Sequence, residues 1–81
     1  MATYIYIWKS GEDEQDVHYS FSPEDGVVGV MAIGRRTGDM RLLHPCPGDD
    51  TNTWYQCACK AVWNQWAVGN LPETTKYIYG G

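Results

Sequence analysis

The chain of 81 residues has no apolar run of the roughly 18 or more residues that a membrane-spanning helix takes. Its first residues, MATYIYIWKSG, lack both a basic segment and a small-residue cleavage site, so we expect no secretory signal peptide. Only three cysteines are present, and an odd number is a poor basis for a disulfide framework. We therefore expect a cytoplasmic protein with reduced thiols and no contact with membranes.

Basic residues are also scarce, since six lysines and arginines stand against ten acidic residues and the formal net charge is −4. An acidic protein repels phosphate backbones, so we expect no nucleic-acid partner. The acids gather in three clusters: Glu12, Asp13, Glu14 and Asp16; Glu24 and Asp25; Asp49 and Asp50. Such clusters commonly serve solubility alone, but they also favour association with a protein that has a basic surface.

The short length predicts a single domain, residues 1–81, that buries only about 60–65% of the surface of its unfolded chain. Aromatic residues make up 14% of the sequence and compensate for this thin core. The segment Thr53–Gly69 contains three of the four tryptophans and is predicted to be helical. Thr53 and Gln56 have the spacing of a capping box, and Gly69 can take the left-handed conformation that ends a helix.

The expected core face of this helix consists of Tyr55, Ala58, Val62 and Trp66, by 3.6-residue geometry. Trp63 falls on its flank, beside the polar residues Lys60 and Asn64. Unless the loop after residue 10 or the connection 70–74 covers Trp63, we expect these three residues to form a binding surface or a self-association contact.

Alternating side chains predict strands at Thr3–Lys9, Val17–Phe21, Met40–His44 and Thr75–Tyr79. Val27–Gly34 is ambiguous, because the preceding Ser-Pro-Glu-Asp could open a helix. Its valines and glycines disfavour that helix, so we interpret it as a further strand. The order β-β-β-β-α-β predicts an α+β fold: a mostly antiparallel sheet of about five strands with one helix packed on one face.

The first and last strands have similar patterns, and we expect them to lie side by side. One face of this pair is predicted to carry Tyr4, Tyr6 and Trp8 together with Tyr77 and Tyr79. The opposite face, beneath the helix, is predicted to carry Ile5, Ile7 and Ile78. Tyrosine and tryptophan are enriched at binding hot spots, so the aromatic face is a candidate binding surface. The alternative is that these rings pack on one another and only stabilise the sheet.

Candidate groups for metal binding or catalysis are few. His44 and Cys46, with Cys57 and Cys59, supply four soft ligands, but residues two apart on a helix cannot both reach one zinc ion. Cys46 precedes the helix, where a thiolate is favoured, yet nearby acids oppose it and no set of oxyanion donors is recognisable. We therefore predict no metal, no cofactor and no enzymatic activity.

The chain ends in Tyr79-Gly80-Gly81, and a diglycine tail after a strand resembles the end of ubiquitin-like sulfur-carrier proteins. The resemblance covers only the last two residues and their strand context. It implies a carrier that is activated on the terminal carboxylate of Gly81. Those carriers have a β-grasp order with the helix nearer the middle, whereas four predicted strands precede the helix here.

The leading hypothesis is a small, acidic, non-catalytic protein-binding module. An inhibitor, an immunity protein or a phage-type antagonist of a basic host protein would fit, and a homodimer is a further option. The carrier acting through Gly81 is the alternative. The candidate partner-binding residues are Glu12, Asp13, Glu14, Asp16, Lys60, Trp63, Tyr4, Tyr6, Trp8, Tyr77 and Tyr79.

Overall fold

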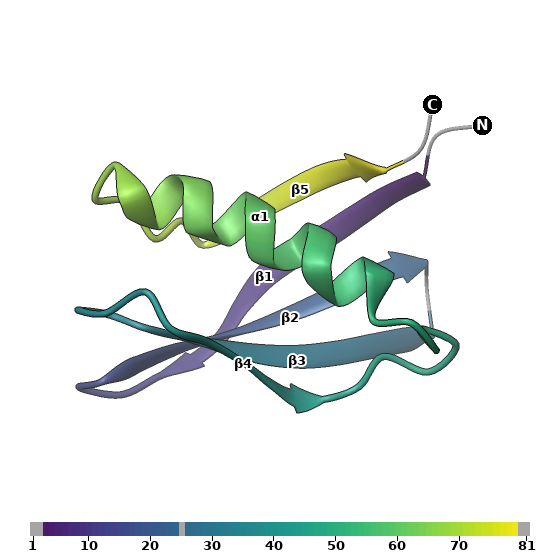
Figure 1. The fold of residues 1–81 in the computed structure, drawn as a ribbon, viewed down its shortest axis with the longest axis horizontal. Helices are drawn as coiled ribbons and strands as arrows, with labels where there is room; N and C mark the ends of the chain where they lie inside the picture. Colours follow the sequence, from purple (N-terminus) through teal and green to yellow (C-terminus); the bar gives the residue numbers. More distant parts are fainter. Residues whose placement is uncertain (1–2, 25, 80–81) are drawn as a thin grey trace.

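The computed structural model describes residues 3–24 and 26–79, which form five strands and one helix (Figure 1). In chain order the elements are β1 (Thr3–Glu12), β2 (Asp16–Glu24), β3 (Val27–Gly34), β4 (Met40–His44), α1 (Thr53–Ala67) and β5 (Thr74–Tyr79). The strands form one antiparallel sheet in the order β4-β3-β2-β1-β5. The predicted α+β class and the order of the elements are confirmed.

The ambiguous segment Val27–Gly34 is strand β3, so the alternative of a helix is wrong. Met31 and Ile33 of this strand are fully buried beneath α1. Gly29 lies directly opposite Phe21 on β2, and a Cβ atom at position 29 would collide with the Phe21 ring. The glycine that lowers helix propensity here therefore also makes room for a core aromatic ring.

The two terminal strands pair as predicted, but their register differs from the predicted one. Tyr4 lies opposite Ile78, and Ile5 lies opposite Tyr77. Directly opposite residues of an antiparallel pair point to the same face, so Tyr77 shares the helix-covered face with Ile5. The predicted grouping of Tyr77 with Tyr4, and of Ile78 with Ile5, is wrong. A shift of one residue exchanges the faces of a strand, and both faces of TKYIY are apolar enough for either arrangement.

The C-terminal end of α1 follows the prediction. Gly69 has a φ of +81°, and its backbone N–H donates to the carbonyl of Trp66 at 2.9 Å. The N–H of Asn70 donates to the carbonyl of Gln65, also at 2.9 Å. This pair of bonds is a Schellman motif, which satisfies two of the carbonyls that a helix end leaves free.

The N-terminal end of α1 differs from the predicted capping box. Asn52 precedes the helix with a φ of 57° and makes no capping bond through its side chain. The carboxylate of Asp49 instead accepts hydrogen bonds from the backbone N–H groups of Trp54 and Tyr55, at 3.1 and 3.0 Å. Asp49 is buried, so a residue predicted to lie in an acidic surface cluster is a structural part of the helix start.

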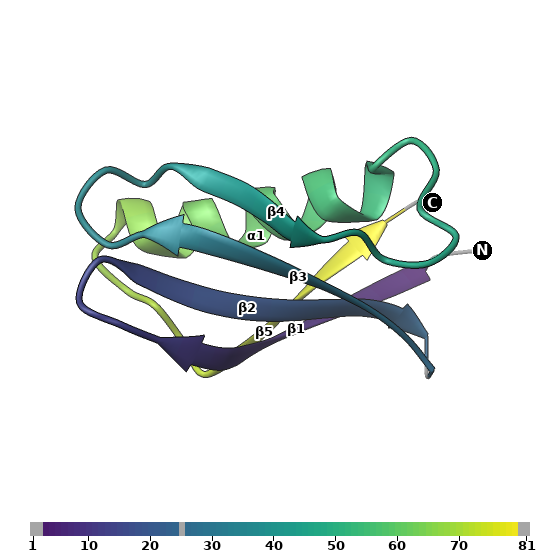
Figure 2. The same cartoon turned by 90° about the horizontal axis from the view of Figure 1, so that it is seen from below.

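The core lies between α1 and one face of the sheet. Its buried residues are Ile5, Ile7, Val17, Tyr19, Phe21, Met31, Ile33, Cys46, Cys57, Ala58, Ala61 and Val62. Tyr55 and Trp66, predicted for the core face of the helix, are half-buried and pack against this cluster. Figure 2 shows α1 along one side of the sheet, and no other helix or strand of residues 3–24 and 26–79 lies on the opposite side.

Two aromatic side chains tie loops to this core. The Tyr19 hydroxyl donates to the carbonyl of Pro72 at 2.7 Å, which holds the connection between α1 and β5. The indole Nε1 of Trp66 donates to the carbonyl of Arg35 at 2.9 Å, which holds the turn between β3 and β4. No helix in the described residues has the length and apolar character needed to cross a membrane.

Replacing Val62 by alanine is expected to lower the free energy of unfolding by about 1–3 kcal/mol, because buried methyl groups between helix and sheet are lost. Val68→Ala is the matched control, since Val68 lies at the end of α1 with 77% of its surface exposed. There the same change is expected to alter the free energy of unfolding by less than about 0.5 kcal/mol. Chemical denaturation measures both, and equal effects at the two positions would contradict the assigned core.

Alkaline pH is expected to destabilise the fold through Tyr19. Burial raises the pKa of Tyr19 from 10.0 to about 12, so the folded state disfavours the phenolate. The resulting stability is complete below the unfolded pKa of 10.0 and is lost as the pH rises towards 12. Tyr19→Phe is expected to remove this part of the alkaline loss, and to cost about 0.5–1.5 kcal/mol at neutral pH because the Pro72 carbonyl loses its donor.

Denaturation of both proteins at neutral and alkaline pH tests this expectation. Burial also raises the pKa of Tyr55 to about 12, so the part of the loss due to Tyr55 should remain in the variant. Identical pH profiles for the wild type and Tyr19→Phe would contradict the role of Tyr19.

Candidate functional site

The face of the sheet turned away from α1, here called the outer face, carries large exposed side chains from three strands. On β1, Tyr4 and Tyr6 are 43% and 53% exposed. On β5, Ile78 is 57% exposed, and on β3, Val28 is 42% exposed. Exposed apolar groups that gather on one face of a small protein mark a site of interaction, whereas scattered ones carry no such meaning.

Two open hollows lie on either side of Tyr6 and Trp8 of β1. The hollow on the β5 side has a volume of about 430 Å³ and is lined by Tyr6, Ile7, Trp8, Thr74, Thr75 and Lys76. The hollow on the side of β2 and β3 has a volume of about 570 Å³ and is lined by Tyr6, Trp8, Ser22, Glu24, Gly26 and Val28. The outer face is therefore a ridge of two rings between two depressions.

The aromatic rings of the outer face already contact one another and a cation. The ring centroids of Tyr4 and Tyr6 are 6.3 Å apart, with the planes tilted by 31°. The ammonium Nζ of Lys76 lies 5.3 Å from the centroid of the Tyr4 ring, within the range of a cation–π interaction. The rings thus stabilise the sheet in part, while most of Tyr6 remains available to a partner.

The predicted aromatic face is confirmed for its β1 residues, because Tyr4, Tyr6 and Trp8 share the outer face. Tyr77 does not belong to it, since it is half-buried against the core. The side chain of Tyr79 lies outside the described part of the structure. Val28 was not among the predicted residues, although the alternation of β3 about the buried Met31 indicates its face. Ile78 was predicted on the opposite face, because only the pairing register reveals where it lies.

The cluster of Glu12, Asp13, Glu14 and Asp16 was predicted to favour a basic partner, and in the structure three of these acids make contacts within the chain. The Asp13 carboxylate accepts hydrogen bonds from the backbone N–H groups of Gln15 and Asp16, at 2.8 and 2.7 Å. These bonds lower the pKa of Asp13, the one to Asp16 having the larger effect. Asp13 therefore holds the turn together and is not simply a charge on its surface.

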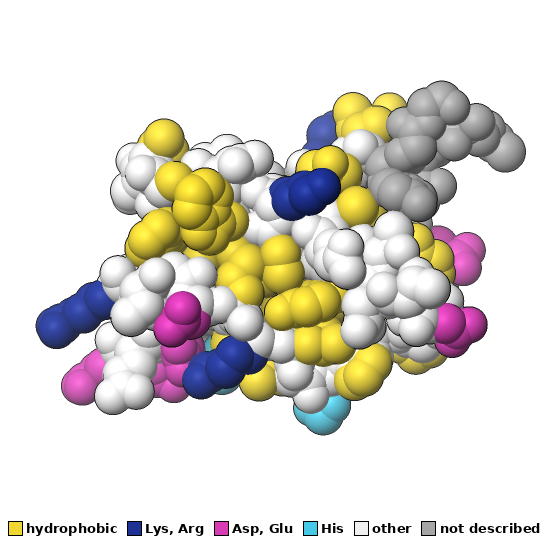
Figure 3. All heavy atoms as spheres, in the orientation of Figure 1, with side chains coloured by type: hydrophobic (Ala, Val, Ile, Leu, Met, Phe, Trp, Pro, Cys, Tyr) yellow, Lys and Arg dark blue, Asp and Glu magenta, His cyan; other side chains and the backbone are white. Residues whose placement is uncertain are grey.

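Arginines of neighbouring elements pair with two other acids of this cluster. Arg35 forms an ion pair with Glu12 and donates through Nε to the backbone carbonyl of Asp13 at 2.8 Å. Arg41 pairs with Asp16 at 2.7 Å. Figure 3 shows acidic and basic side chains interleaved at the end of the sheet where the β1–β2 and β3–β4 turns lie. No local sequence pattern predicts these pairs, because the partners lie more than 20 residues apart in the chain.

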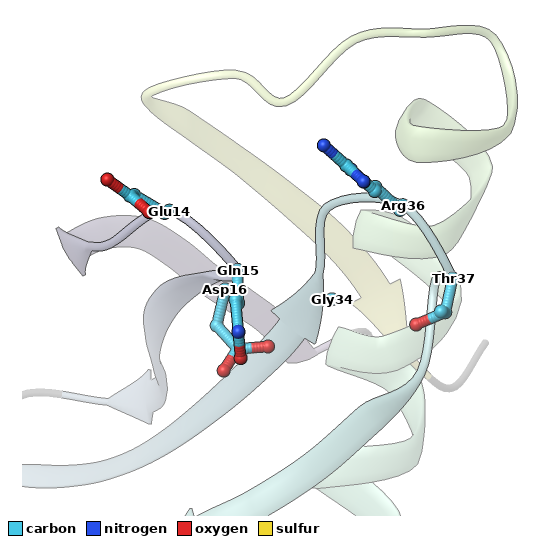
Figure 4. A pocket seen from close by; sticks show the side chains of 6 residues that line it. All are labelled: Glu14, Gln15, Asp16, Gly34, Arg36 and Thr37. Carbon is cyan, nitrogen blue, oxygen red and sulfur yellow. The ribbon is translucent and has the colours of Figure 1, made fainter.

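Glu14 is the acid of this cluster whose side chain forms neither an ion pair nor a hydrogen bond with a described residue. It lines a polar hollow of about 430 Å³ between the two turns, with Gln15, Asp16, Gly34, Arg36 and Thr37. In Figure 4, the side chain of Glu14 extends outward from the β1–β2 turn, while Thr37 turns towards Gly34. Because both acidic and basic side chains line this hollow, it presents no concentrated negative potential to a basic partner.

The surface of α1 presents a second, smaller group of candidates. Trp63 is 48% exposed, and Lys60 and Asn64 beside it are exposed as well. The Trp63 ring is tilted against Trp66, with 6.1 Å between the ring centroids. Of the two alternatives left open for Trp63, the exposed one holds, since neither of the two connections considered as a cover buries it.

The three cysteines are free, and their thiols are disfavoured as nucleophiles. Cys46 is only 3% exposed, and its pKa is raised by burial and, to a smaller extent, by the Asp49 carboxylate. Burial likewise raises the pKa values of Cys57 and Cys59. In residues 3–24 and 26–79, no three histidine, cysteine or acidic side chains come close enough together to hold a metal ion.

Comparisons of this chain with models of protein families, with curated proteins and with solved structures find no match. The assignment of a function therefore depends on the surfaces described above.

Replacing Asp13 by alanine is expected to destabilise the protein at neutral pH, because two backbone N–H groups of the turn lose their acceptor. Because folding lowers the pKa of Asp13, its carboxylate contributes stability at pH values above the ordinary pKa of 3.8. That stability is lost as the pH falls through the pKa of the folded state. The difference between wild type and variant should therefore shrink at acidic pH. Thermal unfolding as a function of pH measures it, with Glu14→Ala as the control that should change little. A difference independent of pH would argue against this role.

Proposed function

We propose that the protein is a small, non-catalytic protein-binding module whose partner binds to the outer face of the sheet. The observation that carries this proposal is the exposure of Tyr4, Tyr6, Val28 and Ile78 on one face that no other described element covers. Aromatic side chains supply large contact areas at low entropic cost, which is why they dominate binding hot spots.

The backbone that carries this face is well suited to binding. β1 is hydrogen-bonded on both sides, to β2 and to β5, so Tyr6 and Trp8 project from a fixed position. A surface that is ordered before association loses little conformational entropy when a partner binds. Side chains of a partner would fit into the two hollows beside Tyr6 and Trp8.

A basic partner remains our proposal, on the basis of the net charge of −4. Arg35 and Arg41 already pair with Glu12 and Asp16. The acidic cluster at residues 12–16 therefore contributes less net negative charge than its four acids suggest. An inhibitor, an immunity protein or a phage-type antagonist acts by this kind of binding, without catalysis. The raised thiol pKa values support the absence of nucleophilic chemistry, and three free cysteines suit a reducing compartment such as the cytoplasm.

The other hypotheses have less support from the structure. The Trp63 surface contains one large exposed ring with two polar neighbours, whereas the outer face joins side chains from three strands. For the carrier hypothesis, Gly80 and Gly81 lie outside the described residues. The antiparallel order β4-β3-β2-β1-β5, with the helix before the last strand, adds nothing to the resemblance at the tail.

Affinity capture at low salt from the native host, with mass spectrometry of the bound proteins, tests this proposal. Tyr6→Ala is expected to weaken binding of the captured partner by about 30-fold, which corresponds to about 2 kcal/mol for a hot-spot residue. Trp63→Ala is the matched control, because it removes an exposed aromatic ring from the helix side and should leave affinity unchanged.

The outcomes separate the two surfaces. If Trp63→Ala abolishes capture and Tyr6→Ala does not, the partner binds α1 and the outer-face proposal is wrong. If no protein is retained by the wild type, the proposal of a protein-binding module fails as well. Thermal unfolding of both variants shows whether a loss of binding reflects a loss of the fold.

A further inference from the structure

The two hollows of the outer face differ in charge. Lys76 lines the hollow on the β5 side, and Glu24 lines the hollow on the side of β2 and β3. Glu24 is exposed, and no described residue forms an ion pair with it. The negative charge of Glu24 is therefore not compensated by a described residue, whereas arginines of the same chain neutralise Glu12 and Asp16.

The walls of the Glu24 hollow combine two aromatic residues with one carboxylate. Tyr6 and Trp8 contribute aromatic rings from β1, and Glu24 contributes a carboxylate from the end of β2. Aromatic faces attract cations, as the position of Lys76 Nζ 5.3 Å from the Tyr4 ring shows on this same surface. A carboxylate beside such rings adds charge-assisted hydrogen bonds.

We propose that this hollow binds an arginine side chain of the partner protein, held between the rings of Tyr6 and Trp8 and the carboxylate of Glu24. The inference rests on the proposed function and names the group that the outer face recognises. Arginine fits better than lysine, because its planar guanidinium stacks on aromatic rings and donates two hydrogen bonds to one carboxylate. Lys76 repels a cation from the hollow on the other side of the ridge, so the charges also orient the partner across the sheet.

A titration of the isotope-labelled protein with N-acetyl-arginine amide, followed by NMR, tests the site without any knowledge of the partner. Shifts are expected at the Trp8 indole N–H and at the backbone amides of Glu24, Gly26 and Val28. The neutral N-acetyl-norleucine amide should leave these signals unchanged. Equal shifts with N-acetyl-lysine amide would overturn the choice of arginine, and no shift at millimolar arginine amide would overturn the site.

Glu24→Gln is the deciding variant, because it removes the charge and retains the shape of the side chain. It is expected to weaken arginine amide binding by about fivefold, the sum of modest exposed charge contacts. Glu14→Gln is the matched control, since Glu14 is an exposed acid of the β1–β2 turn and lines a different hollow. Equal weakening by both changes would show that only overall charge matters, and would overturn the site.

Failure of this inference is distinguishable from failure of the proposed function. If Tyr6→Ala prevents capture of the partner and Glu24→Gln does not affect it, the arginine site is wrong while the outer face stands. If neither change affects capture, the outer-face proposal itself is wrong. Shifts of the same signals with protein concentration alone would place a second copy of the chain in the hollow and overturn the assignment to a different partner.

Discussion

One helix cannot cover both faces of a five-stranded sheet, and most features of this protein follow from that constraint. The core must form on a single face, so β1 and β2 direct Ile5, Ile7 and Tyr19 towards α1. The helix must then be fixed firmly at both ends. Asp49 accepts two N–H groups at its start, and the Schellman bonds around Gly69 close its end. As a consequence, no described helix or strand covers the outer face. Its exposed aromatic rings are the feature that best supports a binding function.

The charges of the chain are divided between structure and surface. Arg35 and Arg41 join the β3–β4 hairpin to the β1–β2 turn, so these arginines and their acidic partners act mainly within the protein. Exposed ion pairs of this kind contribute little stability individually, but together with the Asp13 turn they order one end of the sheet. Glu24, at the opposite end of β2, stays free to recognise a partner in our proposal.

Local signals in the sequence were sufficient for the order of the elements. The bounds of β3 and β4 and the stop at Gly69 agree with the structure, because turns, glycines and alternation act within a few residues. Long-range choices were not predictable in this way. The register of β5 on β1 decides the face of Tyr77, and no local pattern distinguishes the two registers.

The candidate site shows the same division. Alternation within one strand was enough to place Tyr4, Tyr6 and Trp8 on one face. The pairing of Arg35 with Glu12 joins positions 23 apart in the chain, and composition gives no sign of it. In the sequence, Asp49 resembles one acid of a surface pair. In the structure, the path of the loop places it at the first turn of α1, where it accepts two backbone N–H groups.

Hydroxyl-radical footprinting with mass spectrometry, in the free protein and with its partner bound, tests the central claim most directly. The claim is that the outer face is open in the free protein and is closed by the partner. Tyr4 and Tyr6 should be oxidised readily in the free protein and protected in the complex, while Trp63 stays reactive in both and buried Tyr19 in neither. Protection of Tyr4 and Tyr6 in the free protein, or their unchanged oxidation in the complex, would contradict it.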